Sequence, residues 1–323
     1  MAVQIPEGET PEGQAPEGET PDQKAQDEKG LAYYVYRGCF TIGRITPRPL
    51  AAALAWAAGR ACAATMADRR VLVGRNLERV AGHPLSRDEL DQGIKASFDT
   101  YARYWMESTR ATGTGPAELE ARMSMEGLHH IDAALAEGKG AIIALPHLGS
   151  WDFGGAWIAS TGYPLTVVAE EVKPRALFDW FVEMRADLGL EVVPLGPQAA
   201  SAVGRALRHN RLVALVSDRD LVGNGAEVEF FGERTRLPAG PATMALRTGA
   251  AILPAAIYLR PRGRCHAVIR PALPVKPTGQ GLRADITELT QSLARELEEL
   301  IRVAPEQWHM MQPNWPSDPG YQA

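Results

Sequence analysis

The stretch Gly138-Lys-Gly-Ala-Ile-Ile-Ala-Leu-Pro-His147-Leu-Gly-Ser-Trp-Asp152 decides the fold of this chain. Its uncharged run over residues 141–145 is bounded by glycines and by Pro146, which predicts a central strand of a parallel sheet covered on both faces. Open α/β sheets bind their ligands beyond the carboxyl ends of such strands. The residues that follow this strand are therefore candidates for a functional site.

His147 and Asp152, with four residues between them, stand at the end of this predicted strand. In such a turn an imidazole can face the substrate as a general base while the carboxylate of Asp152 fixes its tautomer and stabilises the imidazolium. The alternative is a hydrogen-bonded structural histidine, with Asp152 as the N-cap of a short helix. The spacing alone does not separate these two interpretations.

A second pair with the same spacing, His83 and Asp88, serves as an internal control. There Ser86 is followed three residues later by Glu89, which predicts a capping box at the start of a helix rather than a site.

The rest of the chain alternates strand-like and helix-like segments. Further strands are predicted over residues 165–169, 190–194, 212–216, 251–258 and 265–269, and helices over 129–137, 174–188, 199–209 and 286–303. Strand, helix, strand repeats of this length favour right-handed parallel crossovers. We therefore expect an α/β fold with a mostly parallel central sheet and helices on both faces.

Composition divides the 323 residues into four parts. Residues 1–30 repeat Pro-Glu-Gly with a period of five, which predicts a disordered acidic tail that accounts for much of the net charge of −5. Residues 31–127 are predicted to be a helical N-terminal region, 128–316 the α/β core and 317–323 a C-terminal tail. Without a basic segment leading into an apolar run, the N-terminus does not resemble a secretion signal.

Residues 31–66 are apolar and aromatic, but arginines and prolines interrupt them before they reach the ~18–20 residues of a membrane span. They are expected either to lie in the lipid headgroup layer or to pack on the core. In the following helix, Phe98, Tyr101 and Trp105 recur at helical spacing, a pattern more typical of a core than of a lipid groove.

The charge and cysteine patterns exclude several classes. The arginines are scattered, so nothing favours nucleic-acid binding. Cys39, Cys62 and Cys265 are widely separated, without the spacing of a zinc site or a disulfide framework, which fits a reducing, cytoplasmic setting. No serine stands in a Gly-x-Ser-x-Gly elbow and no cysteine adjoins His147, so an acyl-enzyme route has no evident nucleophile.

Five segments together carry a family resemblance. They are the His147 turn, Ser217-Asp-Arg-Asp220, residues 228–241, Gly249-Ala-Ala-Ile-Leu-Pro254 and the closing Glu306-Gln-Trp-His-Met-Met-Gln-Pro-Asn-Trp315. In order and spacing they resemble the lipid A biosynthesis acyltransferases over roughly residues 31–316, and most closely the members that act on phosphatidylinositol mannosides. The resemblance implies a peripheral enzyme on the cytoplasmic face of the plasma membrane. It would move a fatty acyl group, palmitoyl above all, from acyl-CoA to a mannose hydroxyl, without any cofactor or metal.

The resemblance also assigns roles by position. His147 and Asp152 match the family's catalytic pair, Glu170 matches a glutamate associated with the sugar acceptor, and Arg185 matches a basic residue facing the inositol phosphate. A third catalytic carboxylate falls on Asp218. The closest relatives are expected to have glutamate there, so the shorter aspartate is expected to reach the acceptor only through water. The alternative is a solvated acid at a strand end.

Three further arginines, Arg219, Arg234 and Arg236, are candidates to bind substrate phosphates. Phe230 and Phe231, beside the last two, are interpreted as core rather than as acyl-chain contacts.

Three other functions stay open. A metal-dependent hydrolase would use His147, Asp152, Asp218 and Asp220 as ligands. A silent membrane adaptor would keep the fold without consuming acyl-CoA. Within the transferase class, the acceptor could be another glycolipid or a lysophospholipid.

Overall fold

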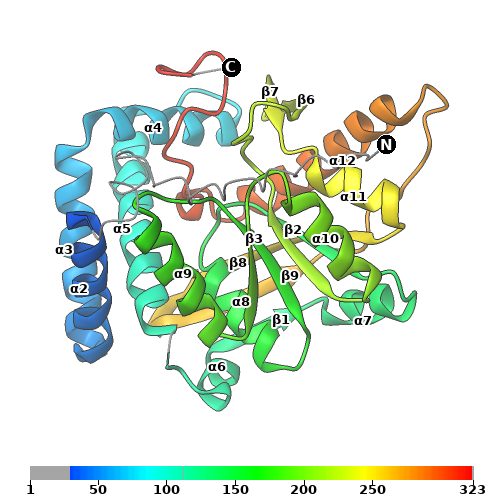
Figure 1. Cartoon of the computed structure of the whole chain (residues 1–323). Helices are drawn as coiled ribbons and strands as arrows, with labels where there is room; N and C mark the ends of the chain where they lie inside the picture. The colour runs from blue at the N-terminus through cyan, green and yellow to red at the C-terminus, as the bar shows by residue number, and fades with distance from the viewer. Residues whose placement is uncertain (1–29, 112, 322–323) are drawn as a thin grey trace, which may run out of the picture.

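The computed structural model describes residues 30–111 and 113–321. A seven-stranded sheet in the order β1-β9-β8-β2-β5-β3-β4 forms its centre, with helices on both sides (Figure 1). The five strands from β8 to β4 are parallel, whereas β9 pairs with β8 in the antiparallel sense and β1 runs parallel to β9. The expected α/β class with a mostly parallel sheet is confirmed. The acidic tail predicted over residues 1–30 lies, except for Gly30, outside the described residues.

The strands are β1 (Met123–Glu126), β2 (Ala141–Leu145), β3 (Leu165–Ala169), β4 (Leu190–Pro194), β5 (Leu212–Val216), β6 (Ala226–Phe230), β7 (Glu233–Leu237), β8 (Ala251–Arg260) and β9 (Arg264–Ile269). All of the predicted strands form. β2 to β5 have the predicted bounds, because each is a short, largely apolar run with a proline or a charged residue at or just beyond its end. β1 and the separate hairpin β6–β7 were not predicted. β1 and β6 carry charged or polar residues at alternate positions, and β7 is polar over residues 233–236, so none of them is an uninterrupted apolar run.

The helices are α2 (Leu31–Ile45), α3 (Arg48–Thr65), α4 (Ala67–Ala81), α5 (Arg87–Ala111), α6 (Pro116–Arg122), α7 (Leu128–Ala136), α8 (Trp151–Ser160), α9 (Arg175–Asp187), α10 (Ala199–Arg208), α11 (Gly240–Thr248) and α12 (Leu282–Arg302). The predicted capping box opens α5: the backbone N–H of Glu89 donates to Ser86 Oγ, and the backbone N–H of Ser86 donates to Glu89 Oε2. The His83 and Asp88 spacing is thus a helix start, as expected.

The side chains of alternate strand residues belong to two hydrophobic clusters, one on each face of the sheet. On one face Ile142 and Val213 pack with α10, α11, α12 and the β6–β7 hairpin. On the other, Ile143 and Leu212 pack with α7 and α8. Phe230 and Phe231 belong to the first cluster, which confirms their assignment to the core. Burial on both faces explains why the parallel strands read as continuous apolar runs.

Helices α2 to α5 form a layer at one side of the sheet (Figure 1). The aromatic residues that recur at helical spacing on α5 lie in two different environments. Phe98 is buried in a small core with α3 and α4, whereas Trp105 packs against α2 and α9 and lines a cavity. Among the described residues, no single helix combines the length and apolarity needed to cross a bilayer; α3 and α4 do so only as a pair, which is bent by 97°.

Candidate active site

The turn between β2 and α8 presents His147 at the carboxyl edge of the sheet. Gly149 makes this turn possible: its φ is +64°, and a Cβ at this position would lie 1.8 Å from the carbonyl oxygen of Ile257. Only glycine tolerates both conditions. The close approach of β8 lets the backbone N–H of Ser150 donate to that same carbonyl, at 3.0 Å, and holds the turn in place.

The carboxylate that contacts His147 is that of Asp218. Nδ1 of His147 lies 2.7 Å from Asp218 Oδ1, and the backbone N–H of His147 donates to Oδ2 at 2.9 Å. Strand register brings the two residues together: β2 and β5 are parallel with Leu145 opposite Val216, so 147 and 218 each stand two residues beyond a paired position. The Asp218 side chain is 0% exposed, so the alternative interpretation of Asp218 as a solvated acid is wrong, and the expected contact with the acceptor through water finds no support in this geometry. Its role as a catalytic carboxylate stays a prediction.

The electrostatics of this pair suit a general base. Burial alone would raise the pKa of Asp218, but the positive charge available on His147, and hydrogen bonds from His147 and Trp308, hold it below its ordinary value. An ionised carboxylate only accepts hydrogen bonds, so Nδ1 carries the proton and Nε2 keeps a free lone pair. The His147 side chain is 33% exposed and lines the cavity described below.

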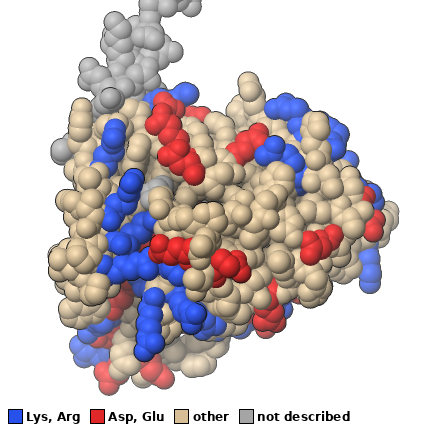
Figure 2. Space-filling model, turned by 90° about the horizontal axis from the view of Figure 1, so that it is seen from below, with Lys and Arg blue, Asp and Glu red and all other residues tan. Residues whose placement is uncertain are grey.

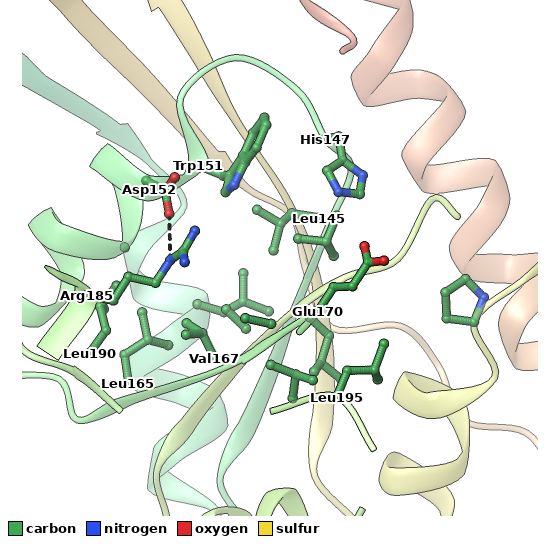
Figure 3. Close-up of a pocket in the computed structure, with 18 of the residues that line it drawn as sticks. Leu145, His147, Trp151, Asp152, Leu165, Val167, Glu170, Arg185, Leu190 and Leu195 are labelled. Atoms are coloured by element: carbon green, nitrogen blue, oxygen red, sulfur yellow. Dashed lines mark hydrogen bonds and ion pairs between the residues drawn. The ribbon is translucent and has the colours of Figure 1, made fainter. Parts of the chain in front are cut away.

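Asp152 does not orient His147, contrary to the prediction. Its Oδ2 accepts a hydrogen bond from the Tyr104 hydroxyl at 2.7 Å, and its Oδ1 lies 3.2 Å from Arg185 Nε. Figure 3 shows the Asp152 carboxylate turned toward Arg185, with Trp151 between it and His147. The reason is the chain path: His147 lies in the turn that follows β2, whereas Asp152 lies in the first turn of α8 and contacts Tyr104 of α5 and Arg185 of α9.

The Asp152 contacts form a buried electrostatic unit. Its negative charge raises the pKa of Arg185, and burial followed by the same charge raises the pKa of Tyr104 well above its ordinary value. Tyr104 therefore remains a hydrogen-bond donor and Arg185 a cation. Arg185, which the resemblance matches to a residue facing the inositol phosphate, is thus held by an internal partner, although it also lines the cavity described below.

An apolar cavity of about 800 Å³ opens beside His147. Figure 3 shows its wall passing from Leu145 near the imidazole to Val167, Leu165 and Leu190 below Arg185. Further lining residues come from the sheet and from α8 and α9, among them Ile143, Ile158, Phe178 and Met184. The cavity is large enough for a ligand of drug size, for which pockets of about 300–1,000 Å³ are typical.

Two predicted substrate residues stand at the polar end of this cavity. Glu170 follows β3 and is exposed, and Arg219 follows Asp218 and is half-buried. Burial lowers the pKa of Arg219, while the charges of Glu170 and Asp218 oppose that effect.

Arg234 and Arg236 are not brought to the cavity. They lie on β7, outside the residues that line it, and Arg236 faces Glu227 across the hairpin at 3.4 Å. The structure therefore gives no support to their predicted contact with substrate phosphates.

Sequence reasoning missed three groups that hold the site together. Tyr104 binds Asp152; Trp308 Nε1 donates to Asp218 Oδ2 at 2.8 Å; and Asn314 Nδ2 donates to the Asp218 backbone carbonyl at 3.0 Å. Trp308 and Asn314 belong to the closing segment, one of the five that carried the family resemblance. The resemblance drew attention to this segment but assigned no function to either residue. No spacing along the chain relates them to residue 218.

Two of the four side chains proposed as metal ligands, those of Asp152 and Asp220, are hydrogen-bonded to other groups of the protein. Asp152 is bound by Tyr104 and Arg185, and Asp220 accepts hydrogen bonds from the backbone N–H groups of residues 222, 223 and 225. Within the described part of the chain, no three His, Cys, Asp or Glu side chains gather as a metal site would require.

Comparison with known proteins places this geometry in a family. A model of the bacterial lipid A biosynthesis acyltransferases matches residues 23–317. A phosphatidylinositol mannoside acyltransferase of Mycolicibacterium smegmatis is 41% identical over 247 residues, covering 76% of this chain and 79% of the relative. One of the same name from Mycobacterium tuberculosis is 39% identical over 249 residues, 76% of each chain. A lipid A biosynthesis acyltransferase of Haemophilus influenzae is 26% identical over 195 residues, covering 59% of this chain and 58% of that protein. The chain belongs to the bacterial lipid A biosynthesis acyltransferase family and is an acyltransferase.

Proposed function

We propose that this enzyme transfers a fatty acyl group from acyl-CoA to a mannose hydroxyl of a phosphatidylinositol mannoside. The observation that carries the proposal is that His147, paired with Asp218, lines an apolar cavity of about 800 Å³. The acceptor is supported by the names of the two mycobacterial relatives, each matched over about three quarters of this chain.

The geometry favours direct transfer with His147 as the general base. Nε2 takes the proton of the mannose hydroxyl as its oxygen attacks the thioester carbonyl carbon, while Asp218 keeps the Nδ1 proton in place and stabilises the imidazolium. The tetrahedral intermediate then breaks its C–S bond, and the imidazolium returns the proton to the departing CoA thiolate. The products are an ester and free CoA thiol. General base assistance of this kind contributes on the order of 10²- to 10⁴-fold in rate.

Cys265 does not offer a competing nucleophile. It is buried in β9, and burial raises the pKa of its thiol to about 12, so the reactive thiolate is scarce at neutral pH.

Different parts of the cavity suit the two substrates. The apolar wall from Leu145 to Leu190 suits the acyl chain of the donor, because it offers that chain an environment without unpaired polar groups. At the other end Glu170 and Arg219 suit the hydroxyl groups and the phosphate of the acceptor headgroup. The Arg185–Asp152 pair lines the cavity above Leu165 and Leu190, on the side away from Glu170 (Figure 3).

The N-terminal helices suit attachment to the cytoplasmic face of the plasma membrane. Large apolar side chains of α2 and α3 face outward, including Tyr34, Ile42, Ile45, Leu50, Leu54 and Trp56. Figure 2 shows a band of Lys and Arg side chains next to an uncharged edge, on the side of the molecule where α2 and α3 lie in Figure 1. Apolar side chains flanked by cations are typical of helices that lie in an anionic headgroup layer.

A product assay tests the function. Purified enzyme is mixed with isotope-labelled palmitoyl-CoA and a panel of acceptors: mannosylated phosphoinositides, unmannosylated phosphatidylinositol, another glycolipid and a lysophospholipid. Mass spectrometry should find the label esterified to the mannosylated lipid, and His147→Ala should abolish that product. Labelling of another acceptor in preference would overturn the proposed substrate. Vesicle binding without any consumption of acyl-CoA would instead support a silent adaptor.

A further inference from the structure

The closing segment of the chain packs against the turn that carries His147. The Gly149 backbone N–H donates to the Gln307 carbonyl at 2.9 Å, and the His309 N–H donates to the His147 carbonyl at 2.8 Å. The backbones of the catalytic turn and of this segment are thus joined, and they place the Trp308 side chain beside Asp218.

Trp308 completes the hydrogen bonding of the Asp218 carboxylate. Oδ1 faces the imidazole, while Oδ2 accepts from the His147 backbone N–H at 2.9 Å and from the Trp308 indole at 2.8 Å. Trp308 is 3% exposed, packs against Phe230 and Phe231, and is not among the residues that line the cavity. It therefore reaches the reaction only through Asp218.

We propose that Trp308 is a positioning residue of acyl transfer, whose indole N–H locks the Asp218 carboxylate toward His147 and limits the negative charge that the imidazole meets. The inference rests on the proposed general-base role of His147. An indole N–H can only donate, so it favours one orientation of the ionised carboxylate. Each donor on a carboxylate also draws negative charge toward itself, which leaves less to stabilise an imidazolium.

The consequence for His147 has a definite sign. With Trp308 in place, the Asp218 carboxylate has less negative charge left to stabilise a protonated His147 than a less hydrogen-bonded carboxylate would have. Removing the indole N–H should therefore move the acid limb of the rate profile to higher pH. The other groups around the imidazole stay as they are: Glu170 and Arg219 at the cavity mouth, and the Asp152–Arg185 pair beyond Trp151.

His309 is the remaining titratable neighbour. Burial, and secondarily the charge of His147, lower the pKa of His309 to about 3, so it is neutral throughout the assay range.

A matched pair of variants tests the inference, because Trp315 offers the control. Trp315 is 0% exposed and also donates its indole N–H, but to the carbonyl of Phe230 at 3.1 Å. Trp308→Phe and Trp315→Phe thus each remove one buried indole donor from the same aromatic cluster. Both are compared with the wild type in kcat and KM for palmitoyl-CoA across pH 5–9.

In Trp308→Phe we expect the acid limb of kcat to move up by about half a pH unit or more. In Trp315→Phe it should coincide with the wild type, and KM should change little in either. Identical limbs in all three proteins, or equal shifts in both variants, would overturn the inference.

A second measurement does not depend on turnover. The proton on Nδ1 of His147 gives a downfield NMR resonance while it is shared with Asp218, and His147→Gln identifies it by its loss. Trp308→Phe should move this resonance further downfield, whereas Trp315→Phe should leave it in place; an unmoved resonance in Trp308→Phe contradicts the inference. If the wild type acylates no mannoside, the proposed function fails while this readout still decides the role of Trp308.

A sulfur analogue covers the case in which Trp308→Phe does not fold. Benzothienylalanine, incorporated at position 308, keeps the bicyclic ring and replaces only the N–H by sulfur. The same shifts are expected of it, and their absence counts equally against the inference.

Discussion

Replacing Asp218 by asparagine should inactivate the enzyme by reversing the tautomer of His147. Two donors, the His147 backbone N–H and the Trp308 indole, point at Oδ2. The amide oxygen of asparagine must take that position, because the amide NH₂ would meet two donors there. The NH₂ group then faces Nδ1 of His147, 2.7 Å from the former Oδ1. Nδ1 must accept, so the proton moves to Nε2, and the lone pair facing the substrate is lost.

The size of the loss follows from the role removed. General base assistance is worth on the order of 10²- to 10⁴-fold, and a wrong tautomer in a comparable base–carboxylate pair costs about 10⁴-fold. We expect kcat for Asp218→Asn to fall by at least about 10³-fold. KM for acyl-CoA should change little, since Asp218 is fully buried and does not line the cavity.

The assay is steady-state transfer from labelled palmitoyl-CoA, with His147→Ala measured alongside. The double variant His147→Ala, Asp218→Asn should be no slower than His147→Ala alone, because the carboxylate acts only through the imidazole. Circular dichroism melting controls for folding. A single Asp218→Asn variant that stays within tenfold of wild-type kcat would refute the tautomer argument.

Three further substitutions probe other parts of the structure, and a fourth prediction concerns the pH dependence of stability. Asp152→Asn should lower the free energy of unfolding, measured by urea denaturation. Removing one partner of a buried ion pair costs roughly 3–5 kcal/mol, and we expect a decrease near the low end of that range. Gly149→Ala should give little folded or active enzyme, because its Cβ would lie 1.8 Å from a carbonyl oxygen of β8; soluble expression and near-normal turnover would contradict this. Ile45→Asp, at a side chain 77% exposed on α2, should weaken co-sedimentation with anionic vesicles. Val275→Asp should not, because this exposed residue belongs to the connection between β9 and α12, and α12 lies across the sheet from α2 and α3 (Figure 1). Since the folded-state pKa of Asp218 is lowered, its stabilising effect is complete above about pH 4 and lost as pH falls through that lower value, so acid unfolding should be less steep in Asp218→Asn.

Local sequence determined the secondary elements around the site. The run at 141–145 became β2 because apolar residues covered on both sides need no polar alternation, and the glycines and Pro146 end it. The Ser86–Glu89 box started α5 for an equally local reason: both partners lie within one helical turn. The position of the catalytic histidine followed directly from the end of β2. β1 was not predicted from the sequence, because it is only four residues long and its residues alternate in exposure. Pairing with β9 is what stabilises it as a strand.

What only the tertiary structure decided is which acid serves His147. Spacing along the chain pointed to Asp152, five positions on, yet a turn followed by a helix directs that side chain toward Tyr104 and Arg185. Asp218, 71 positions away, reaches the imidazole because β5 lies beside β2 in parallel register. Trp308, still later, reaches the carboxylate through the fold of the closing segment. Hydrogen bonds depend on distances of about 3 Å in space, and strand order, which sets those distances here, is not written in the separation of residues along the chain.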